Sequence, residues 1–509
     1  MARLTMSSRA RLYPLLTLCT LGCALPAEPG DATSTTDDAT SEASSGTFTD
    51  ASSITESILT TTIAEDPTTG TTGDSTGDEA EIPLATPYLY VDYAPIKRYE
   101  FSWKPVAGAE YYQLLERPYP EVAGWSQLGD DLVGTSITWS MPIHLRLSAA
   151  YKLRACDKTG CKESEPVEVD PGVDGAIGYF KASNAESDDY FGSSVAISAD
   201  GSTMVVGAPF EDSGAHGING DELHNYAKNS GAAYVFVREG DTWKQQAYLK
   251  SFNVDPEDWF GEVAISGNGD TIAVGAPQED SAATGIDGDR HDDSAEDSGA
   301  VYVFERKGSA WSQTAYIKAN NIHPSAQFGR AMALSADGNT IAVGARYEDN
   351  AATGVDGAPW LGLAQNSGAA YVYSRNGEGW AHRAYLKASN TGEGDHFGAS
   401  LALSGDGTTL AVGAPSERSK SAGINGNQVD DDLPSGAVYV FTLERGVWSQ
   451  QAYIKASNSP LSRSFGESIA LASDGDTLAV GASLESSSST EIDGNQWNDE
   501  AFAAGAVYC

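Results

Sequence analysis

The feature that most constrains this 509-residue chain is a unit of about 68 residues that occurs five times between residues 175 and 509. A Phe-Gly pair marks each unit, and successive pairs lie 69, 68, 69 and 68 residues apart. The five pairs are Phe191-Gly192, Phe260-Gly261, Phe328-Gly329, Phe397-Gly398 and Phe465-Gly466. Self-similarity at a fixed period of this size indicates a repeat architecture, in which neighbouring units bury a shared core.

Each unit has the pattern of four strands. In the first unit the runs 194–198, 204–209, 232–237 and 243–250 are apolar or alternate, and polar or Gly-containing segments separate them. The second run is almost wholly apolar, so we expect both of its faces to be buried. Asp200-Gly201 and its counterparts between the first two runs predict a type I′ hairpin.

The ends of these runs carry a family signature. The second run closes with Gly207-Ala208-Pro209, and its counterparts in the second and fourth units are Gly275-Ala276-Pro277 and Gly413-Ala414-Pro415. Together with the Phe-Gly starts, this ending resembles the FG-GAP repeat of integrin α-subunit propellers. The resemblance implies an all-β fold with a β-propeller at 175–509 and an adhesive or ligand-binding face. Integrin-type propellers have seven blades, so five is a departure.

The ends of the repeat region predict how the blades close. The last unit runs only to Cys509, early in its third strand, whereas Ile177–Ala182 resembles a fourth strand. We therefore expect this N-terminal segment to complete the last blade and close a five-bladed ring, which would remove exposed strand edges. A truncated product or an open array is the alternative.

A smaller β domain is predicted at 84–170. Tyr99, Phe101 and Trp103 alternate as in a half-buried strand. Their phrase, with Tyr111-Tyr112 and the run ending at Cys156, resembles a fibronectin type III β-sandwich, which implies a spacer or a binding module. Cys156 and Cys161 lie five residues apart, and in an exported protein we expect them to form a disulfide. Cys509 has no obvious partner.

The N-terminus is typical of an export signal. Arginines precede a short apolar stretch, Leu12–Leu21, that is too short to span a bilayer, which predicts a signal peptide at 1–22. The stretch ends at Gly22-Cys23 and resembles a bacterial lipobox, which implies lipidation of Cys23; ordinary cleavage nearby is the alternative. Of the 48 residues from 31 to 78, 23 are Ser or Thr, so we interpret 23–83 as a solvated stalk.

The charge balance restricts the partners. With 71 acidic and 31 basic side chains the formal net charge is −40, which argues against nucleic acid and against anionic membrane surfaces. The lipid anchor is then the expected attachment to a membrane, at the outer membrane or cell surface, with secretion as the alternative. So acidic a surface also favours cation binding.

The long segment between the second and third strands is the candidate cation site. It opens with acidic pairs such as Glu211-Asp212 and continues with a recurring Ile/Val-Asn/Asp-Gly motif. In the second unit, four acidic residues of this segment crowd together: Asp287, Asp289, Asp292 and Asp293. Two interpretations stay open, since oxygen-rich loops can hold calcium and the same residues can form Asx-type turns with solvated carboxylates.

No catalytic pattern stands out, and we expect a protein that is not an enzyme. The seven histidines do not recur with the repeat, and the chain lacks a Ser nucleophile elbow and a phosphate-binding Gly loop. One apolar patch, with Trp360, Leu361 and Leu363, is either a partner site or a cover for a neighbouring loop.

These features favour a surface-anchored recognition or adhesion protein that binds a protein or glycan ligand. The alternatives are a secreted carbohydrate-binding or carbohydrate-cleaving propeller and a structural envelope protein.

Overall fold

The computed structural model describes residues 83–509 except 121–123, 241, 359–361, 378, 430–433 and 460–461. The predicted signal peptide at 1–22, Cys23 and all of the predicted stalk but its last residue lie outside the described residues. The described part consists of β-strands with two short 3₁₀ helices, η1 (Ile143–Leu145) and η2 (Pro171–Ala176). The all-β prediction is therefore confirmed. No helix in this part is both long and apolar enough to cross a bilayer.

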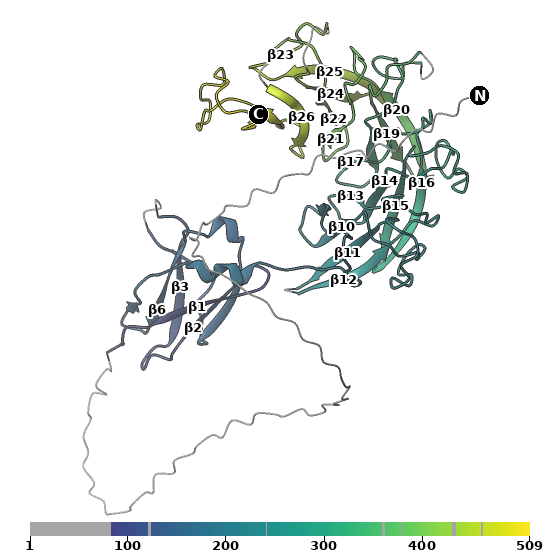
Figure 1. The fold of residues 1–509 in the computed structure, drawn as a ribbon. Coiled ribbons are helices and arrows are strands. Elements are labelled where there is room, and N and C mark those ends of the chain that lie inside the picture. Colours follow the sequence, from purple (N-terminus) through teal and green to yellow (C-terminus); the bar gives the residue numbers. More distant parts are fainter. Residues whose placement is uncertain are drawn as a thin grey trace, which may run out of the picture. The chain divides into compact units, whose positions relative to one another are not determined.

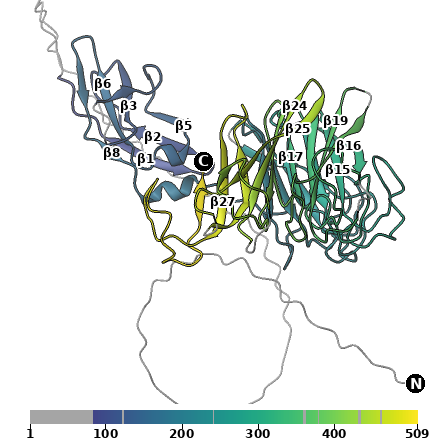
Figure 2. The ribbon, with the colours of Figure 1, turned by 90° about the horizontal axis from the view of Figure 1, so that it is seen from above.

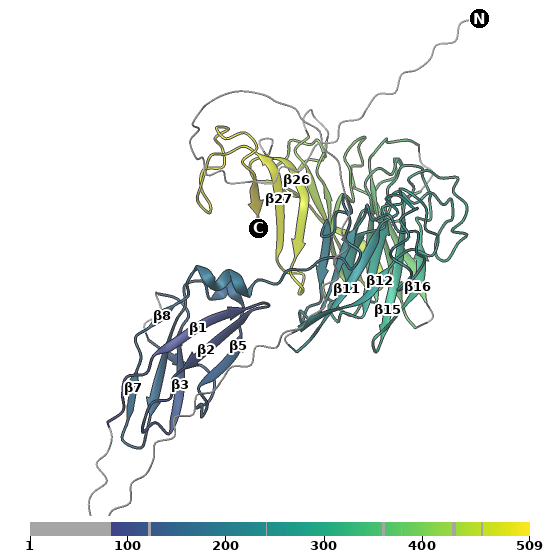
Figure 3. The same ribbon diagram turned by 60° about the horizontal axis from the view of Figure 1, so that its bottom comes forward.

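Residues 89–168 form two sheets that share one core (Figure 3). One sheet has the order β1 (Leu89–Ala94), β2 (Arg98–Trp103), β5 (Ser136–Ser140). The other has the order β4 (Ser126–Gln127), β3 (Tyr111–Arg117), β6 (Ala150–Cys156), β7 (Cys161–Glu163), with β8 (Val167–Glu168) also on β6. The alternating Tyr99, Phe101 and Trp103 are buried, because every second residue of β2 faces the other sheet.

The five repeats form five antiparallel sheets, the blades of a β-propeller. The first holds β9 (Ser194–Ile197), β10 (Thr203–Ala208), β11 (Ala232–Glu239) and β12 (Thr242–Leu249). The second holds β13 (Glu262–Ile265), β14 (Thr271–Ala276), β15 (Ala300–Lys307) and β16 (Ala310–Ile317). The third holds β17 (Ala331–Leu334), β18 (Thr340–Ala345), β19 (Ala369–Arg375) and β20 (Trp380–Leu386).

The last two sheets vary this pattern. The fourth holds β21 (Ser400–Leu403), β22 (Thr409–Ala414), β24 (Ala437–Glu444) and β25 (Val447–Lys455), with a short outer strand, β23 (Gly423–Ile424). The fifth holds β26 (Ser462–Leu471), β27 (Leu478–Glu485) and β28 (Ala506–Tyr508). The first strand of each unit contacts the first strand of the next. In Figure 1, β13, β17 and β21 accordingly lie on the inner side and β16, β20 and β25 on the outer side, and Figure 2 shows the sheets from above.

The two glycines of the repeat signature touch where neighbouring units meet. A Cβ on Gly207 would lie 1.8 Å from the carbonyl oxygen of Gly261 in the next unit, and one on Gly275 would lie 2.0 Å from that of Gly329. In the first four units the amide of the Phe-Gly glycine also donates to the carbonyl of the Gly-Ala glycine of its own unit, as from Gly261 to Gly275 at 3.0 Å. Backbone packs directly on backbone at this junction, so no side chain fits there.

The hairpin between the first two strands differs from the predicted type I′ turn. Gly201 has a φ of +67°, but Asp200 is absent from the residues with positive φ, whereas type I′ needs positive φ at both central positions. The amide of Gly201 donates to the carbonyl of Ser198, and the Asp200 carboxylate accepts from the Ser198 hydroxyl at 2.6 Å. The loop is therefore longer than two residues, and the Asp side chain closes it.

A buried ion pair lies in each of the first four units. Lys318, at the end of the fourth strand, places its Nζ 2.5 Å from the carboxylate of Glu279, and both side chains are at most 2% exposed. The hydroxyl of Tyr316 donates to the same carboxylate at 2.6 Å, and Asn253 from the preceding unit donates at 3.1 Å. The corresponding Lys–Glu pairs are Lys250–Glu211, Lys387–Glu348 and Lys455–Glu417. We call this arrangement the glutamate network.

The closing strand predicted from Ile177–Ala182 is not formed. Among the described residues, no strand links the fifth sheet to this segment, and the fifth sheet has three strands. Phe180 packs against Phe236 and Trp243 of the first unit, with ring centroids 5.5 and 5.6 Å apart. Leu249 of the first unit packs on the second unit in the same way, so the segment contacts its following unit as a fourth strand does, but it is not paired with the fifth sheet.

The glutamate network predicts a large penalty for removing one partner. Lys318→Met leaves the Glu279 carboxylate buried without its cation, and we expect this to cost about 3–5 kcal/mol of unfolding free energy. Lys307→Met, on the exposed end of β15, should change it by less than about 0.5 kcal/mol. Urea unfolding of the two variants and of the double variant Glu279→Gln/Lys318→Met measures this. Equal midpoints for Lys318→Met and Lys307→Met would contradict it.

Candidate functional site

At one position of the repeat the side chain differs between the five units although the backbone conformation is the same. The residue before each Phe-Gly pair has a φ between +54° and +61° in all five units, yet its side chain changes from unit to unit. These residues are Tyr190, Trp259, Gln327, His396 and Ser464. The second residue after each Gly-Ala pair varies in the same way: Phe210, Gln278, Tyr347, Ser416 and Leu484. We call these ten residues the rim.

Aromatic rim residues bridge neighbouring units. The Phe210 ring lies 5.1 Å from the Tyr190 ring in its own unit and 5.1 Å from the Trp259 ring in the next, both edge to face. Tyr190 is 61% exposed, and Phe210 and Trp259 are half-buried. Together they offer an apolar strip across the boundary of the first two units, a surface on which a planar or apolar ligand can stack.

The rim between the third and fourth units is more polar. The Tyr347 ring lies 5.3 Å from the His396 ring, and the Arg346 guanidinium lies 4.7 Å from the Tyr347 ring centroid. Burial, together with the charge of Arg346, lowers the pKa of His396 to about 4. The imidazole is therefore neutral at pH 7, and the hydroxyl of Ser416 lies 3.2 Å from its Nδ1.

A pocket of about 300 Å³ is lined by residues at or next to the first strands of all five units. Its polar lining residues are Ser194, Glu262, Arg330, Ser400 and Ser468. Arg330 places a guanidinium nitrogen 3.6 Å from the Glu262 carboxylate. Burial raises the pKa of Glu262, and Arg330 opposes that shift. Hydroxyls, one cation and one acid can bind a small polar group. We call this the axial pocket; in each unit the rim residue before the Phe-Gly pair lies three or four positions ahead of a polar lining residue.

The long loops have a structural role at the outer edge of the blades. Asp287 has a φ of +53°, and its carboxylate accepts the backbone amide of Tyr316 in the fourth strand at 2.9 Å. Ile286 beside it forms a bridge to Ile317. Asn219 and Asn425 make the same side-chain bond in their units, to Tyr248 and Tyr453. The recurring Ile/Val-Asn/Asp-Gly motif thus covers the open edge of the fourth strand.

Three of the four aspartates singled out in the second unit, Asp287, Asp289 and Asp292, accept hydrogen bonds from protein groups. Asp289 accepts the amide of His291 at 3.1 Å, and Asp292 accepts the hydroxyl of Ser294 at 2.6 Å. Burial, and after it the charge of Asp293, raises the pKa of Asp255. Within the residues that the structure describes, no group of three or more His, Cys, Asp or Glu is placed to hold a metal ion. The Asx-turn interpretation describes Asp289, whose carboxylate accepts the amide two residues on, whereas Asp287 bonds across to the fourth strand. Calcium stays a prediction.

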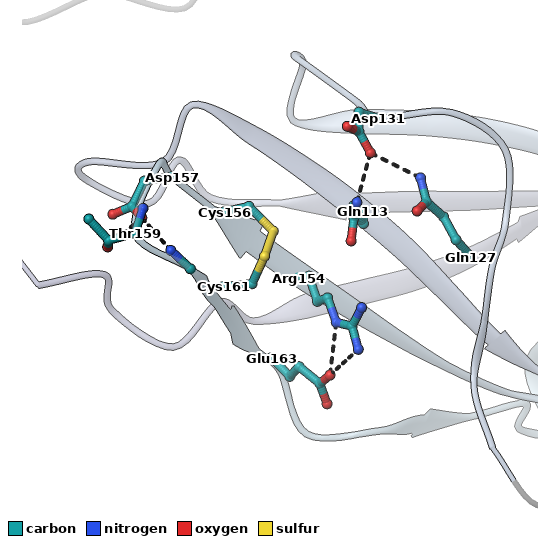
Figure 4. The surroundings of a disulfide bond; sticks show 10 residues. Gln113, Gln127, Asp131, Arg154, Cys156, Asp157, Thr159, Cys161 and Glu163 are labelled. Atoms are coloured by element: carbon teal, nitrogen blue, oxygen red, sulfur yellow. Dashed lines mark hydrogen bonds and ion pairs between the residues drawn. A yellow bond between two sulfur atoms is a disulfide. The ribbon is translucent and has the colours of Figure 1, made fainter.

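The other predicted site residues have different outcomes. Cys156 and Cys161 form the expected disulfide between β6 and β7, beside the Arg154–Glu163 ion pair (Figure 4). Cys509 is exposed and free. Trp360 and Leu361 lie outside the described residues, as does Cys23. Leu363, the third member of the predicted apolar patch, is 84% exposed and forms a bridge to Asn350.

Sequence reasoning did not identify the rim or the axial pocket. A usable signal was present, because the residue before each Phe-Gly pair changes while the pair itself does not. Positive φ at that position, which shows the five backbones to be equivalent, becomes visible only in the structure.

Comparison with known proteins identifies the repeat. Residues 178–236, 311–373 and 380–441 match the FG-GAP repeat family, so the chain carries FG-GAP repeats. No curated protein matches the chain.

Three solved structures resemble the chain weakly. A candidate 6-phosphogluconolactonase from Bacteroides uniformis is 13% identical, with 68% of this chain and 98% of that chain covered and a TM-score of 0.32. The FN1–FN3 domains of chicken CNTN1 are 11% identical, with 60% and 99% covered and a TM-score of 0.15. A DUF4784 family protein from Bacteroides caccae is 8% identical, with 74% and 85% covered and a TM-score of 0.19. Similarities at this level carry no argument about fold or activity.

The two interpretations of Asp287 predict a different dependence of the melting temperature on calcium. If its carboxylate acts only as a hydrogen-bond acceptor, Asp287→Asn should melt like the unchanged protein in both calcium and EDTA, because Asn serves at the equivalent positions. Asp287→Ala should lose about 0.5–1.5 kcal/mol. Thermal melts of the three proteins in calcium and in EDTA test this. A calcium-dependent rise in Tm that Asp287→Asn abolishes would instead support a calcium site.

Proposed function

We propose that this FG-GAP repeat protein is a non-catalytic recognition or adhesion protein of the bacterial surface, which binds its ligand with the rim and the axial pocket. The observation that carries the proposal is the contrast between two sets of equivalent positions. The glutamate network repeats Lys, Tyr, Glu and Asn in four units, as a structural element must. The rim keeps its backbone and changes its side chains, as a surface adapted to one particular ligand would.

The composition of the site favours binding through local contacts. The aromatic strip of Tyr190, Phe210 and Trp259 supplies apolar area with little conformational entropy to lose. The hydroxyls and the Arg330 guanidinium of the axial pocket supply polar groups that fix the orientation of a ligand. A protein ligand that inserts one polar side chain fits both features.

A carbohydrate ligand is the second candidate, and the aromatic strip is the observation that favours it. Sugar rings stack on exposed aromatic faces, and their hydroxyls match Ser, Glu and Arg side chains of the kind in the axial pocket. A structural envelope role is the third possibility. It would leave the rim without a soluble ligand and would show as fixed stoichiometry with another surface protein.

Attachment to the membrane through Cys23 completes the proposal. The lipobox-like Gly22-Cys23 and the Ser/Thr-rich stalk after it support an outer-membrane or cell-surface lipoprotein whose folded part is held away from the bilayer.

Rim variants should lose binding without losing stability. We expect Tyr190→Ala to weaken binding about tenfold, the effect of about 1.4 kcal/mol, because Tyr190 is the most exposed member of the aromatic strip. Tyr226→Ala, a 75% exposed tyrosine of a long loop, is the matched control and should bind normally. Binding is measured on a glycan array and on an array of immobilised extracellular proteins. Equal binding by both variants would exclude the rim, and no binding to either array would favour the envelope role.

The anchor predicts a covalent label at one cysteine. Bacterial cells that express the full chain and are fed an alkyne analogue of palmitate should label it, and Cys23→Ala should abolish the label and release the protein from the membrane fraction. Cys19→Ala, inside the predicted signal peptide, is the control and should keep the label. A label that survives Cys23→Ala would exclude this anchor.

A further inference from the structure

The boundary between the third and fourth units differs in charge from the other boundaries. Arg346 stands where the first, second and fourth units have proline, and Arg418 stands where the first three units have aspartate. The prolines are Pro209, Pro277 and Pro415, and the aspartates are Asp212, Asp280 and Asp349. Two cations thus replace neutral or acidic residues in a chain whose formal net charge is −40.

Both arginines adjoin the segment that ends at His396. The charge of Arg346 acts on His396, and its guanidinium lies 4.7 Å from the ring centroid of Tyr347, which lies 5.3 Å from that of His396. Arg418 reaches the same segment from the fourth unit, because a Cβ on Gly394 would lie 3.6 Å from one of its guanidinium nitrogens. We call the following residues the arginine site: Arg346, Tyr347, His396, Ser416 and Arg418.

Neither arginine has an ion-pair or hydrogen-bond partner in the part of the chain that the structure describes. The Nε of Arg346 is shielded from solvent and still unpaired there. Other arginines of the propeller are neutralised, since Arg306 binds Asp270 and Arg375 binds Glu305. The two guanidiniums of the arginine site are therefore available to an anion from outside the described chain.

The acids near the site have other contacts or lie in solvent. The Asp395 carboxylate accepts the amide of Gly392 at 2.8 Å, and Glu417 is buried against Lys455. Glu393 is exposed and forms no ion pair with a described residue. The protein thus leaves the positive charge of the arginine site in place.

The fold explains why the aspartate is missing but not why an arginine replaces it. The aspartates of the first three units each accept a backbone amide, as Asp280 accepts that of Asp297 at 2.7 Å. In the fourth unit the corresponding residue is Pro434, which has no amide hydrogen to donate. No acceptor is needed at Arg418, and a small polar residue would satisfy the fold as well as a cation.

The remaining groups of the site match a sugar acid. A guanidinium binds a carboxylate or a sulfate through two parallel N–H bonds. The neutral imidazole of His396 and the hydroxyl of Ser416, 3.2 Å apart, can exchange hydrogen bonds with sugar hydroxyls, and the Tyr347 ring offers an apolar face. Arg418 is exposed and the other four side chains are half-buried, so a ligand can reach them.

We propose that the arginine site binds the carboxylate or sulfate group of an acidic sugar within a mostly neutral glycan. The assignment rests on the proposed function, because Tyr347, His396 and Ser416 belong to the rim. The ligand is mostly neutral because a chain charged at −40 repels a polyanion, whereas a single anionic group meets two unpaired cations. An acidic protein segment has the anionic group but lacks the ring of hydroxyls that the neutral side chains can bind.

A glycan array with each glycan in a neutral, a uronate and a sulfated form tests the proposal. The full chain should bind at least one acidic form about tenfold more tightly than its neutral counterpart. Arg346→Pro and Arg418→Asp, which restore the residues of the other units, should each reduce this preference and leave binding of the neutral form unchanged. Arg445→Gln, at an exposed arginine of the turn after β24, is the control and should keep the preference. The uronate and sulfate arms show which anionic group is bound.

Both variants should melt like the unchanged protein. Proline occupies the position of Arg346 in three other units, and the Arg418 side chain is exposed. Should Arg346→Pro lose its cooperative transition, Arg346→Gln takes its place with the same expected loss of preference.

The outcomes separate this inference from the proposed function. Equal binding of neutral and acidic forms, or a preference that survives both variants, would overturn the inference and leave the rim as a ligand-binding surface. Binding to acidic segments on the array of extracellular proteins, with none to glycans, would also overturn it. No binding to either array would contradict the proposed function itself, and the inference would fall with it.

Discussion

A carboxylate removed from water in every blade is the constraint on which the repeat array depends. Glu211, Glu279, Glu348 and Glu417 are at most 2% exposed, and a charge buried this deeply is tolerated only when it is paired and hydrogen-bonded. Each glutamate has three partners from two places: a lysine and a tyrosine at the fourth strand of its own unit, and an asparagine that precedes the unit. Each glutamate therefore ties the loop, the outer strand and the neighbouring blade together.

The glycine junction works with this network at the inner side of the sheets. Because the backbones of Gly207 and Gly261 touch, successive units approach more closely than any side chain would permit. The network then fixes the outer side, where Asn253 crosses to Glu279. With both sides fixed, the short segments that carry the rim need not contribute to stability, which leaves their side chains free to differ.

Much of the blade could be predicted from sequence, because strand patterns and turns are local. The runs expected at 204–209, 232–237 and 243–250 are β10, β11 and β12 to within two residues at either end, and the Cys156–Cys161 disulfide formed as expected. The glutamate network could not be predicted, because Lys250 lies 39 residues after Glu211 and no local pattern pairs them.

Features that depend on packing between units also could not be predicted from the sequence. The motif at Ile286-Asp287 suggested calcium as readily as a turn, since only the fold reveals the strand edge that it covers. Closure by Ile177–Ala182 was expected from the pattern alone, and the pattern is indeed that of a fourth strand. Whether such a strand meets its own last sheet depends on the angles between units, which no residue encodes singly.

Net charge bears on what the rim can bind. At a formal net charge of −40 the chain repels anions at long range, so an acidic ligand should associate more slowly, and its association rate should rise with salt. Arg330 does not reverse this field, because Glu262 lies 3.6 Å from its guanidinium. A neutral ligand pays no such penalty, and the aromatic strip of Tyr190, Phe210 and Trp259 binds through contact area rather than charge. The negative charge of the chain and the aromatic strip together favour a neutral or cationic ligand. A neutral glycan or a basic protein segment fits this surface better than an acidic protein segment does.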